Sequence, residues 1–264
     1  MIPIGGMLAI HDQYLAPSLL VPFAEDMAHR LSRISTGPLL ETCAGVGALT
    51  RAIASSVSAG MTVIATDPSA DAIAYASAKP GVARVTWQQA DPAALPFPNA
   101  SFGIVTCQFG IVAMPDPVRA FVEARRVMRP GARFVFNVPA LLRQNPVADC
   151  LQDAMDMLFP SDPPKFLENV LHLYADNAVI DDDLTEAGFT DAIYTSVELP
   201  YLAEAAWDAA AGYCLGTSLR AEIETRAPGE AERVTRDAAA LLERRFGTGP
   251  IATTMRAYVI SAAG

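Results

Sequence analysis

The stretch Leu39–Thr50, LLETCAGVGALT, decides the fold of this chain. An apolar run leads into Glu41, Gly45 and Gly47 follow, and a helical pattern then continues to about Ser58. This order of strand, acidic residue, glycine turn and helix places backbone without side chains at the carboxyl end of a first strand. The pattern therefore predicts a turn that a ligand can approach closely.

The rest of the chain continues the alternation of strands and helices. Apolar or alternating runs predict strands at residues 38–42, 61–66, 84–89, 102–107, 132–138, 192–199 and 253–261, and helices at 17–32, 71–77, 117–128, 181–187, 203–215 and 229–246. Such alternation implies a parallel sheet with right-handed crossovers, and the last strand is expected to return beside the sixth. We predict an α/β fold with a doubly wound, seven-stranded, mostly parallel sheet, an antiparallel last strand and helical insertions that form a cap.

The predicted elements favour a single domain over residues 1–264. Residues 1–138 would form its ligand-binding half, and the insertions at 139–174 and 201–250 would cap it and line a substrate pocket. The first insertion is rich in apolar side chains, which indicates a hydrophobic or aromatic substrate.

Composition excludes several classes of protein. Hydrophobic residues make up 52% of the 264 residues, which excludes a disordered chain, and 29 acidic against 19 basic residues disfavour a nucleic-acid partner. No apolar run approaches the roughly 20 residues of a membrane helix, so membrane insertion is not expected. The four cysteines are widely spaced, which predicts no metal site and a reducing, cytoplasmic location.

Two nucleotide ligands suit the glycine turn, a dinucleotide such as NAD(P) and S-adenosylmethionine. Asp67 follows the second strand about 20 residues after the glycines and can accept the hydrogen bonds of either ribose diol. The turn lacks the third small residue of the dinucleotide fingerprint. Glu41 would oppose a pyrophosphate but tolerates a cation, and Asp91 can reach an adenine amino group. These details favour S-adenosylmethionine and leave an NAD(P)-dependent oxidoreductase as the weaker alternative.

Four sequence blocks together resemble one family. LLETCAGVGALTRAI, VIATDPSADAIAYA, QQADPAALPFPNASFGIVTCQFG and DPVRAFVEARRVMRPGARFVFNV occur in the order and at the spacing of class I S-adenosylmethionine-dependent methyltransferases of the small-molecule, UbiE-like type (methyltransferase type 11). The resemblance covers residues 14–138, and TEAGF at 185–189 extends it. It implies a Rossmann-like fold and S-adenosyl-L-methionine as the cofactor.

The resemblance also implies roles for individual residues. Those expected at the methionine end of the cofactor are Glu41, Ala44, Gly45, Gly47, Cys107 and Gln108. Those expected at the adenosine end, or over the cofactor, are Asp67, Pro68, Asp91, Pro92 and Tyr14. The chain departs from the family at Cys43, where glycine or alanine is usual.

The implied activity is transfer of a methyl group to a small-molecule, hydrophobic or aromatic acceptor. His172, in the first insertion, is a candidate base or positioning group. The segment Cys107–Gly110 lacks the Asn/Asp-Pro-Pro-aromatic motif of adenine and glutamine methylases, which again disfavours a nucleic-acid substrate. A non-catalytic S-adenosylmethionine-binding partner protein remains the alternative from another class, and a homo-oligomer is compatible with the sequence.

Overall fold

The computed structural model describes residues 4–34 and 37–264. The chain divides into two compact units. The first, called here the sheet unit, comprises Phe23–Pro139, Tyr174–Val197 and Ala257–Gly264. The second, the helical unit, comprises the chain up to Pro22, Ala140–Leu173 and Glu198–Arg256. The arrangement of residues 1–264 as one domain with a cap stays a prediction.

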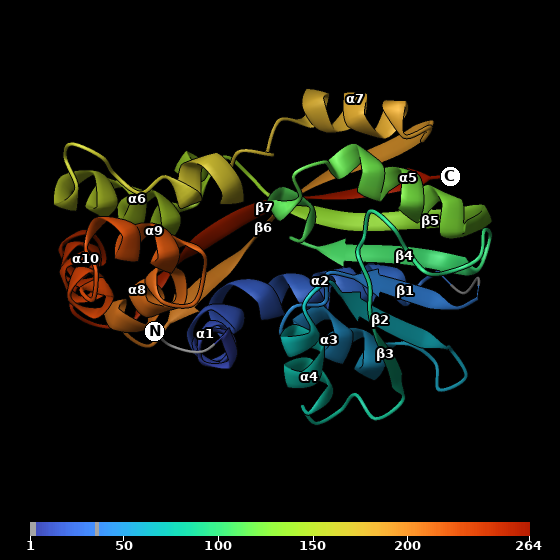
Figure 1. Cartoon of the computed structure of the whole chain (residues 1–264), viewed down its shortest axis with the longest axis horizontal. Coiled ribbons are helices and arrows are strands. Elements are labelled where there is room, and N and C mark those ends of the chain that lie inside the picture. The colour runs from blue at the N-terminus through green and yellow to red at the C-terminus, as the bar shows by residue number, and fades with distance from the viewer. Residues whose placement is uncertain (1–3, 35–36) are drawn as a thin grey trace. The chain divides into compact units, whose positions relative to one another are not determined.

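Seven strands form one sheet in the order β3-β2-β1-β4-β5-β7-β6 (Figure 1). Their bounds are β1 Leu39–Thr42, β2 Val63–Asp67, β3 Val85–Gln89, β4 Phe102–Gln108, β5 Met128–Pro139, β6 Asp191–Ala203 and β7 Ile251–Ala263. Strands β1 to β5 pair in parallel, and β7 runs antiparallel to β5. The predicted sheet is confirmed, and β7 enters between β5 and β6, so its return beside the sixth strand is also confirmed.

The strand order reverses at β1, which lies between β2 and β4. In the register of these strands, Glu41 pairs with Ala65 of β2 and Thr42 pairs with Cys107 of β4. In open α/β sheets, ligands bind outside the carboxyl ends of the strands at such a reversal. The glycine turn after β1 therefore lies where this topology places ligands.

Capping side chains mark where some helices of the sheet unit begin. These helices are α2 Val21–Leu31 (which starts two residues before this unit), α3 Ala48–Ser56, α4 Ala70–Ser77, α5 Pro117–Val127 and α7 Asn177–Glu186, with a 3₁₀ turn, η2, at Ile111–Ala113. Asp116 caps α5 by accepting the N–H of Arg119 at 3.1 Å. Asp176 caps α7, accepting the Ala178 N–H at 2.9 Å, so this helix starts before the predicted Asp181.

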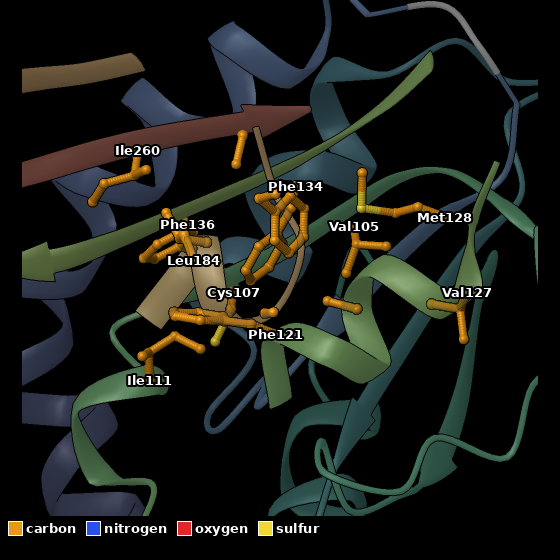
Figure 2. Close-up of a cluster of buried hydrophobic side chains, with 14 of the residues drawn as sticks. Val105, Cys107, Ile111, Phe121, Val127, Met128, Phe134, Phe136, Leu184 and Ile260 are labelled. Carbon is orange, nitrogen blue, oxygen red and sulfur yellow. The ribbon is translucent and has the colours of Figure 1, made fainter. Parts of the chain in front are cut away.

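Aromatic side chains of α5 and β5 fill the core on one face of the sheet. Figure 2 shows Phe121 of α5 against Phe136 and Phe134 of β5, with Leu184 of α7 nearby. The ring centroids of Phe134 and Phe136 lie 4.8 Å apart, and those of Phe121 and Phe136 5.3 Å apart. Burial of each phenyl ring stabilises the fold by about 2–3 kcal/mol.

The helical unit consists mainly of helices that sequence periodicity predicts only in part. It holds α1 Ile4–Ile10, a π-helical segment η1 at His11–Leu20, η3 Leu142–Gln144, α6 Pro146–Leu158, η4 Leu167–Leu171, α8 Ala206–Cys214, α9 Leu219–Arg226 and α10 Ala231–Phe246. Gly212 lets α8 approach η1, because a Cβ there would lie 3.0 Å from the Leu15 nitrogen. No described helix is both long enough and apolar enough to cross a membrane.

Candidate cofactor site

The turn after β1 is fixed to the end of β2 by backbone hydrogen bonds. The Ala44 N–H donates to the carbonyl of Thr66 at 2.9 Å, and the Gly45 N–H donates to Oδ2 of Asp67 at 2.9 Å. Gly45 and Gly47 both have left-handed backbone, with φ of 55° and 76°. The structure thus brings Ala44, Gly45, Gly47 and Asp67 together, as the sequence predicts.

The two glycines of the turn have different surroundings. A Cβ on Gly47 would lie 3.1 Å from Ala76 Cβ and 3.4 Å from the Trp87 ring, so α3 packs closely on its neighbours there. A Cβ on Gly45 would have no described atom within 4 Å. Gly45 therefore leaves open space at the carboxyl end of β1, which is the space that a bound cofactor needs.

Glu41 carries an unusual buried carboxylate on β1. The residue is 1% exposed, and its Oε2 has no hydrogen-bond partner among the described residues. Burial raises the pKa of Glu41 to about 8, and the nearby Cys107 and Asp67 add to the rise, while Thr50 and Arg51 oppose it. A carboxylate in this state is stabilised by a cation, and S-adenosylmethionine carries a sulfonium and an ammonium group. The residues present therefore fit that cofactor.

Asp67 ties two turns together with its two carboxylate oxygens. Oδ1 accepts the Ser69 N–H at 2.8 Å, while Oδ2 accepts that of Gly45. Each oxygen keeps a further lone pair, so the side chain can still accept a ribose hydroxyl. The carbonyl of Pro68, next in the chain, accepts the Gln89 side-chain amide at 2.8 Å.

The loop after β3 presents Asp91 and Pro92. Asp91 is exposed, and its Oδ1 accepts the Ala93 N–H at 2.8 Å. Farther along the loop, Glu123 of α5 accepts the Leu95 N–H at 2.7 Å, and Arg126 donates to the Leu95 carbonyl at 2.8 Å. Two side chains of one helix therefore hold the loop that carries the predicted adenine contacts.

At the end of β4, Cys107 is buried and Gln108 is half-buried, beside the glycine turn in the strand order. Phe109 follows with a left-handed backbone, φ 54°, and its N–H donates to Oδ1 of Asn137 at 2.9 Å. Sequence reasoning missed Asn137, which is fully buried and whose Nδ2 has no partner in the described chain. Its signal was an asparagine inside the apolar strand FVFNVP.

Tyr14 and His172 lie in the helical unit, so their roles at the cofactor stay predictions. His172 is buried, and Nδ1 lies 2.7 Å from the carbonyl of Ala140. Because a carbonyl accepts only, Nδ1 carries the proton and the lone pair is on Nε2. Burial lowers the pKa of His172 to about 4, so the neutral ring is a weak base at pH 7. Among the residues described, no cluster of three or more His, Cys, Asp or Glu is suited to a metal ion.

The sheet order is that of the class I methyltransferase fold. Residues 40–136 match the family model described as "Methyltransferase domain", as the resemblance of the four sequence blocks predicts. The chain is 36% identical over 105 residues to demethylmenaquinone methyltransferase of Lactiplantibacillus plantarum, covering 38% of this chain and 44% of that protein. It is 26% identical over 129 residues to the ubiquinone/menaquinone biosynthesis C-methyltransferase UbiE of Proteus mirabilis, covering 44% and 50%.

These matches span about half the length of the curated relatives. Among solved structures, the YcgJ protein of Bacillus subtilis superposes with a TM-score of 0.58 at 19% identity, covering 92% of this chain and 98% of that one. At this identity the likeness establishes the fold. The sequence-based expectation of a Rossmann-like methyltransferase fold is thus confirmed.

Proposed function

We propose that this protein transfers a methyl group from S-adenosyl-L-methionine to a small hydrophobic acceptor of the quinol type. The single observation that carries the proposal is Glu41, a buried carboxylate with an unpartnered oxygen beside an open glycine turn. A cationic methyl donor stabilises the ionised form of Glu41 and offsets the cost of burying that charge, whereas a pyrophosphate would be repelled by the ionised form.

The bound cofactor would supply an activated methyl group on sulfur. Glu41 would bind the cationic end of the cofactor, and Gly45, without a side chain, would let the cofactor contact the backbone. Asp67 would accept hydrogen bonds from the ribose hydroxyls. Pro68, Asp91 and Pro92 would border the adenine, and Ala44, Gly47, Cys107 and Gln108 would line the methionine end. The protein's remaining task is to align the acceptor with the methyl group and to exclude water.

The names of the curated relatives support a quinol acceptor. One is named for demethylmenaquinone, and another is called a ubiquinone/menaquinone C-methyltransferase. Methylation at a ring carbon requires that carbon to lose a proton, and an ionised neighbouring hydroxyl makes this easier. His172 is the candidate base or positioning group, and its lowered pKa favours the positioning role.

The test is turnover with reduced demethylmenaquinone bearing a short prenyl chain. We expect a product one methylene heavier and an equal amount of S-adenosylhomocysteine, with both strongly reduced in Glu41→Gln. A panel of aromatic amines and thiols serves as the comparison. Methylation of polar amines alone would overturn the acceptor class.

Two alternatives predict other outcomes of the same experiments. A non-catalytic partner protein would bind S-adenosylhomocysteine in calorimetry without turnover of any acceptor. An NAD(P)-dependent oxidoreductase would bind NADPH instead.

The four free cysteines fit a reducing compartment, so we propose that the protein acts in the cytoplasm. We further propose that it acts as a monomer or a homo-oligomer and has no nucleic-acid partner.

A further inference from the structure

Two cysteines meet at the carboxyl ends of β1 and β4. Thr42 pairs in register with Cys107, and Cys43 is the next residue after Thr42. Gly110 packs on both side chains, because a Cβ there would lie 2.5 Å from Cys43 Cβ and 2.8 Å from Cys107 Sγ. The same point would be 3.2 Å from Cys43 Sγ. The two thiols are therefore neighbours, and glycine at position 110 is what leaves room for them.

The sulfur of Cys107 collects hydrogen-bond donors. The Cys43 thiol and the backbone N–H groups of Gly110 and Ile111 are directed at it, and the Thr42 hydroxyl lies nearby, donating to the Thr106 carbonyl at 3.4 Å. These donors lower the pKa of Cys107 despite burial, while donation to Cys107 and burial raise that of Cys43. Of the two thiols, Cys107 is therefore the one that loses its proton more readily.

The other two cysteines have a different environment. Burial raises the pKa of Cys214 to about 12 and also raises that of Cys150. Neither belongs to the sheet unit, where Cys43 and Cys107 lie. Cys43 is half-buried and Cys107 is fully buried, so Cys43 is the more accessible of the two.

We propose that Cys43 and Cys107 form an oxidisable dithiol, whose disulfide disables the cofactor turn. The site would take hydrogen peroxide, and its effect on binding rests on the proposed function. Cys43 reacts first because it is the more accessible thiol, and its raised pKa makes this the slow step. Its sulfur attacks one peroxide oxygen, the O–O bond breaks, and the departing hydroxide takes the thiol proton and leaves as water. Cys107 then attacks the sulfenic sulfur of Cys43, the S–S bond forms, and the S–O bond breaks with loss of a second water. Two thiols are oxidised, and one peroxide is reduced to two waters.

The disulfide would displace the turn that binds the cofactor. A sulfur–sulfur bond is about 2.05 Å long, shorter than any hydrogen bond between the same atoms, so Cys43 and Cys107 must move together. Cys43 already has left-handed backbone, φ 55°, and lies two residues before Gly45. Its movement would be transmitted to the turn and to the Gly45–Asp67 hydrogen bond.

The test is peptide mapping of the full chain after treatment with hydrogen peroxide. Trypsin releases Cys43 in residues 34–51 and Cys107 in residues 85–119. We expect these peptides to be cross-linked, and the link to be absent in Cys43→Ser and Cys107→Ser but retained in Cys150→Ser. Two results would contradict the proposed dithiol. One is over-oxidation of both peptides without a disulfide between them, and the other is an equal yield of this disulfide in urea-unfolded protein.

Calorimetry with S-adenosylhomocysteine then tests the effect on the site. We expect at least tenfold weaker binding after oxidation and full recovery with dithiothreitol, with no such change in Cys43→Ser. Unchanged affinity in the cross-linked protein would overturn the switch. If the cross-link forms but neither redox state binds S-adenosylhomocysteine, the proposed function fails while the dithiol stands.

Discussion

The carboxylate of Asp67 at the end of β2 accepts the backbone N–H of Gly45 in the turn after β1, at 2.9 Å. The same side chain accepts the N–H of Ser69 through its other oxygen. Asp67 is only 8% exposed, so these bonds lie in a largely dry environment. An acid at this position therefore shapes the glycine turn in addition to any contact with a ribose.

Asp67→Asn is expected to damage both the turn and cofactor binding. An amide has a single acceptor oxygen, so one N–H, of Gly45 or Ser69, must face an NH₂ group. Leaving such a donor unsatisfied costs about 1–3 kcal/mol in the free energy of unfolding. We expect this loss in urea unfolding and at least tenfold weaker binding of S-adenosylhomocysteine. The control is Asp91→Asn, an exposed carboxylate with a similar bond to Ala93, which should lose less stability. Equal stability losses in the two variants would contradict the structural role of Asp67.

Glu41 should make the sheet unit less stable as the pH rises. Its pKa is about 8 in the folded chain, against the ordinary 4.5 of a glutamate carboxyl, so the folded state binds the extra proton between these values. The stabilisation is complete below pH 4.5 and is lost as the pH approaches and passes 8, by at most about 5 kcal/mol. Glu41→Gln should remove this slope, which pH-dependent urea unfolding would measure. A cationic cofactor should bind the ionised form and release a proton, detectable by calorimetry in buffers of different ionisation enthalpy.

The part of the fold near the cofactor could be predicted because its signals are local. A continuous apolar run indicates a strand buried within a parallel sheet. Glycines or an acid directly after such a run indicate the carboxyl end of the strand. The sequence predicts a helix at 117–128 and a strand at 132–138, but β5 already begins at Met128 and includes Pro130 and Gly131. The first four residues of β5, at 128–131, precede the apolar run that predicts the strand. Sequence periodicity does not detect such an extension.

The helical unit could be predicted less well, for physical reasons visible in two segments. The π-helix His11–Leu20 contains Pro17 and has no 3.6-residue stripe, so periodicity could not extend the predicted 17–32 helix to its true start. In α9, the buried residues are Leu219 and Ile223, too few for a pattern among charged neighbours. The Asn137–Phe109 bond was also missed, because it joins residues 28 positions apart.

Gly45 and Gly47 should respond differently to alanine. Both substitutions place a side chain in left-handed backbone, at about 1–2 kcal/mol. Gly47→Ala also drives a methyl against Ala76 and Trp87, which adds about 1–3 kcal/mol. We expect Gly47→Ala to lower stability more, and Gly45→Ala to weaken S-adenosylhomocysteine binding more, since its methyl enters the open space. The reverse order in thermal unfolding and calorimetry would show that the ligand does not lie against Gly45.

Arg126 should hold the loop that carries Asp91. Its guanidinium donates to the carbonyls of Leu95 and Phe97 at 2.8 and 2.7 Å and pairs with Glu123. Arg126→Ala is expected to speed hydrogen exchange at the Leu95 amide at least tenfold and to weaken cofactor binding. Arg233→Ala, which removes an exposed ion pair on α10, is the control and should change neither. Unchanged exchange at Leu95 in Arg126→Ala would exclude this anchoring role.

His172 should make stability depend on pH in the direction opposite to Glu41. Its pKa is lowered to about 4, against 6.5 for the model group, so the unfolded chain binds the extra proton between these values. The stabilisation is complete above pH 6.5 and is lost as the pH falls through 4, by at most about 3 kcal/mol. Between pH 4.5 and 6.5 the contributions of the two residues therefore oppose each other, and above 6.5 that of Glu41 remains. In Glu41→Gln, the free energy of unfolding should therefore rise with pH between 4 and 6.5, as His172 alone predicts. The amide of His172→Asn can still donate to the Ala140 carbonyl. In this variant, the free energy of unfolding should fall between pH 4.5 and 8, as Glu41 alone predicts. Parallel pH profiles of unfolding in the two variants would contradict both assignments.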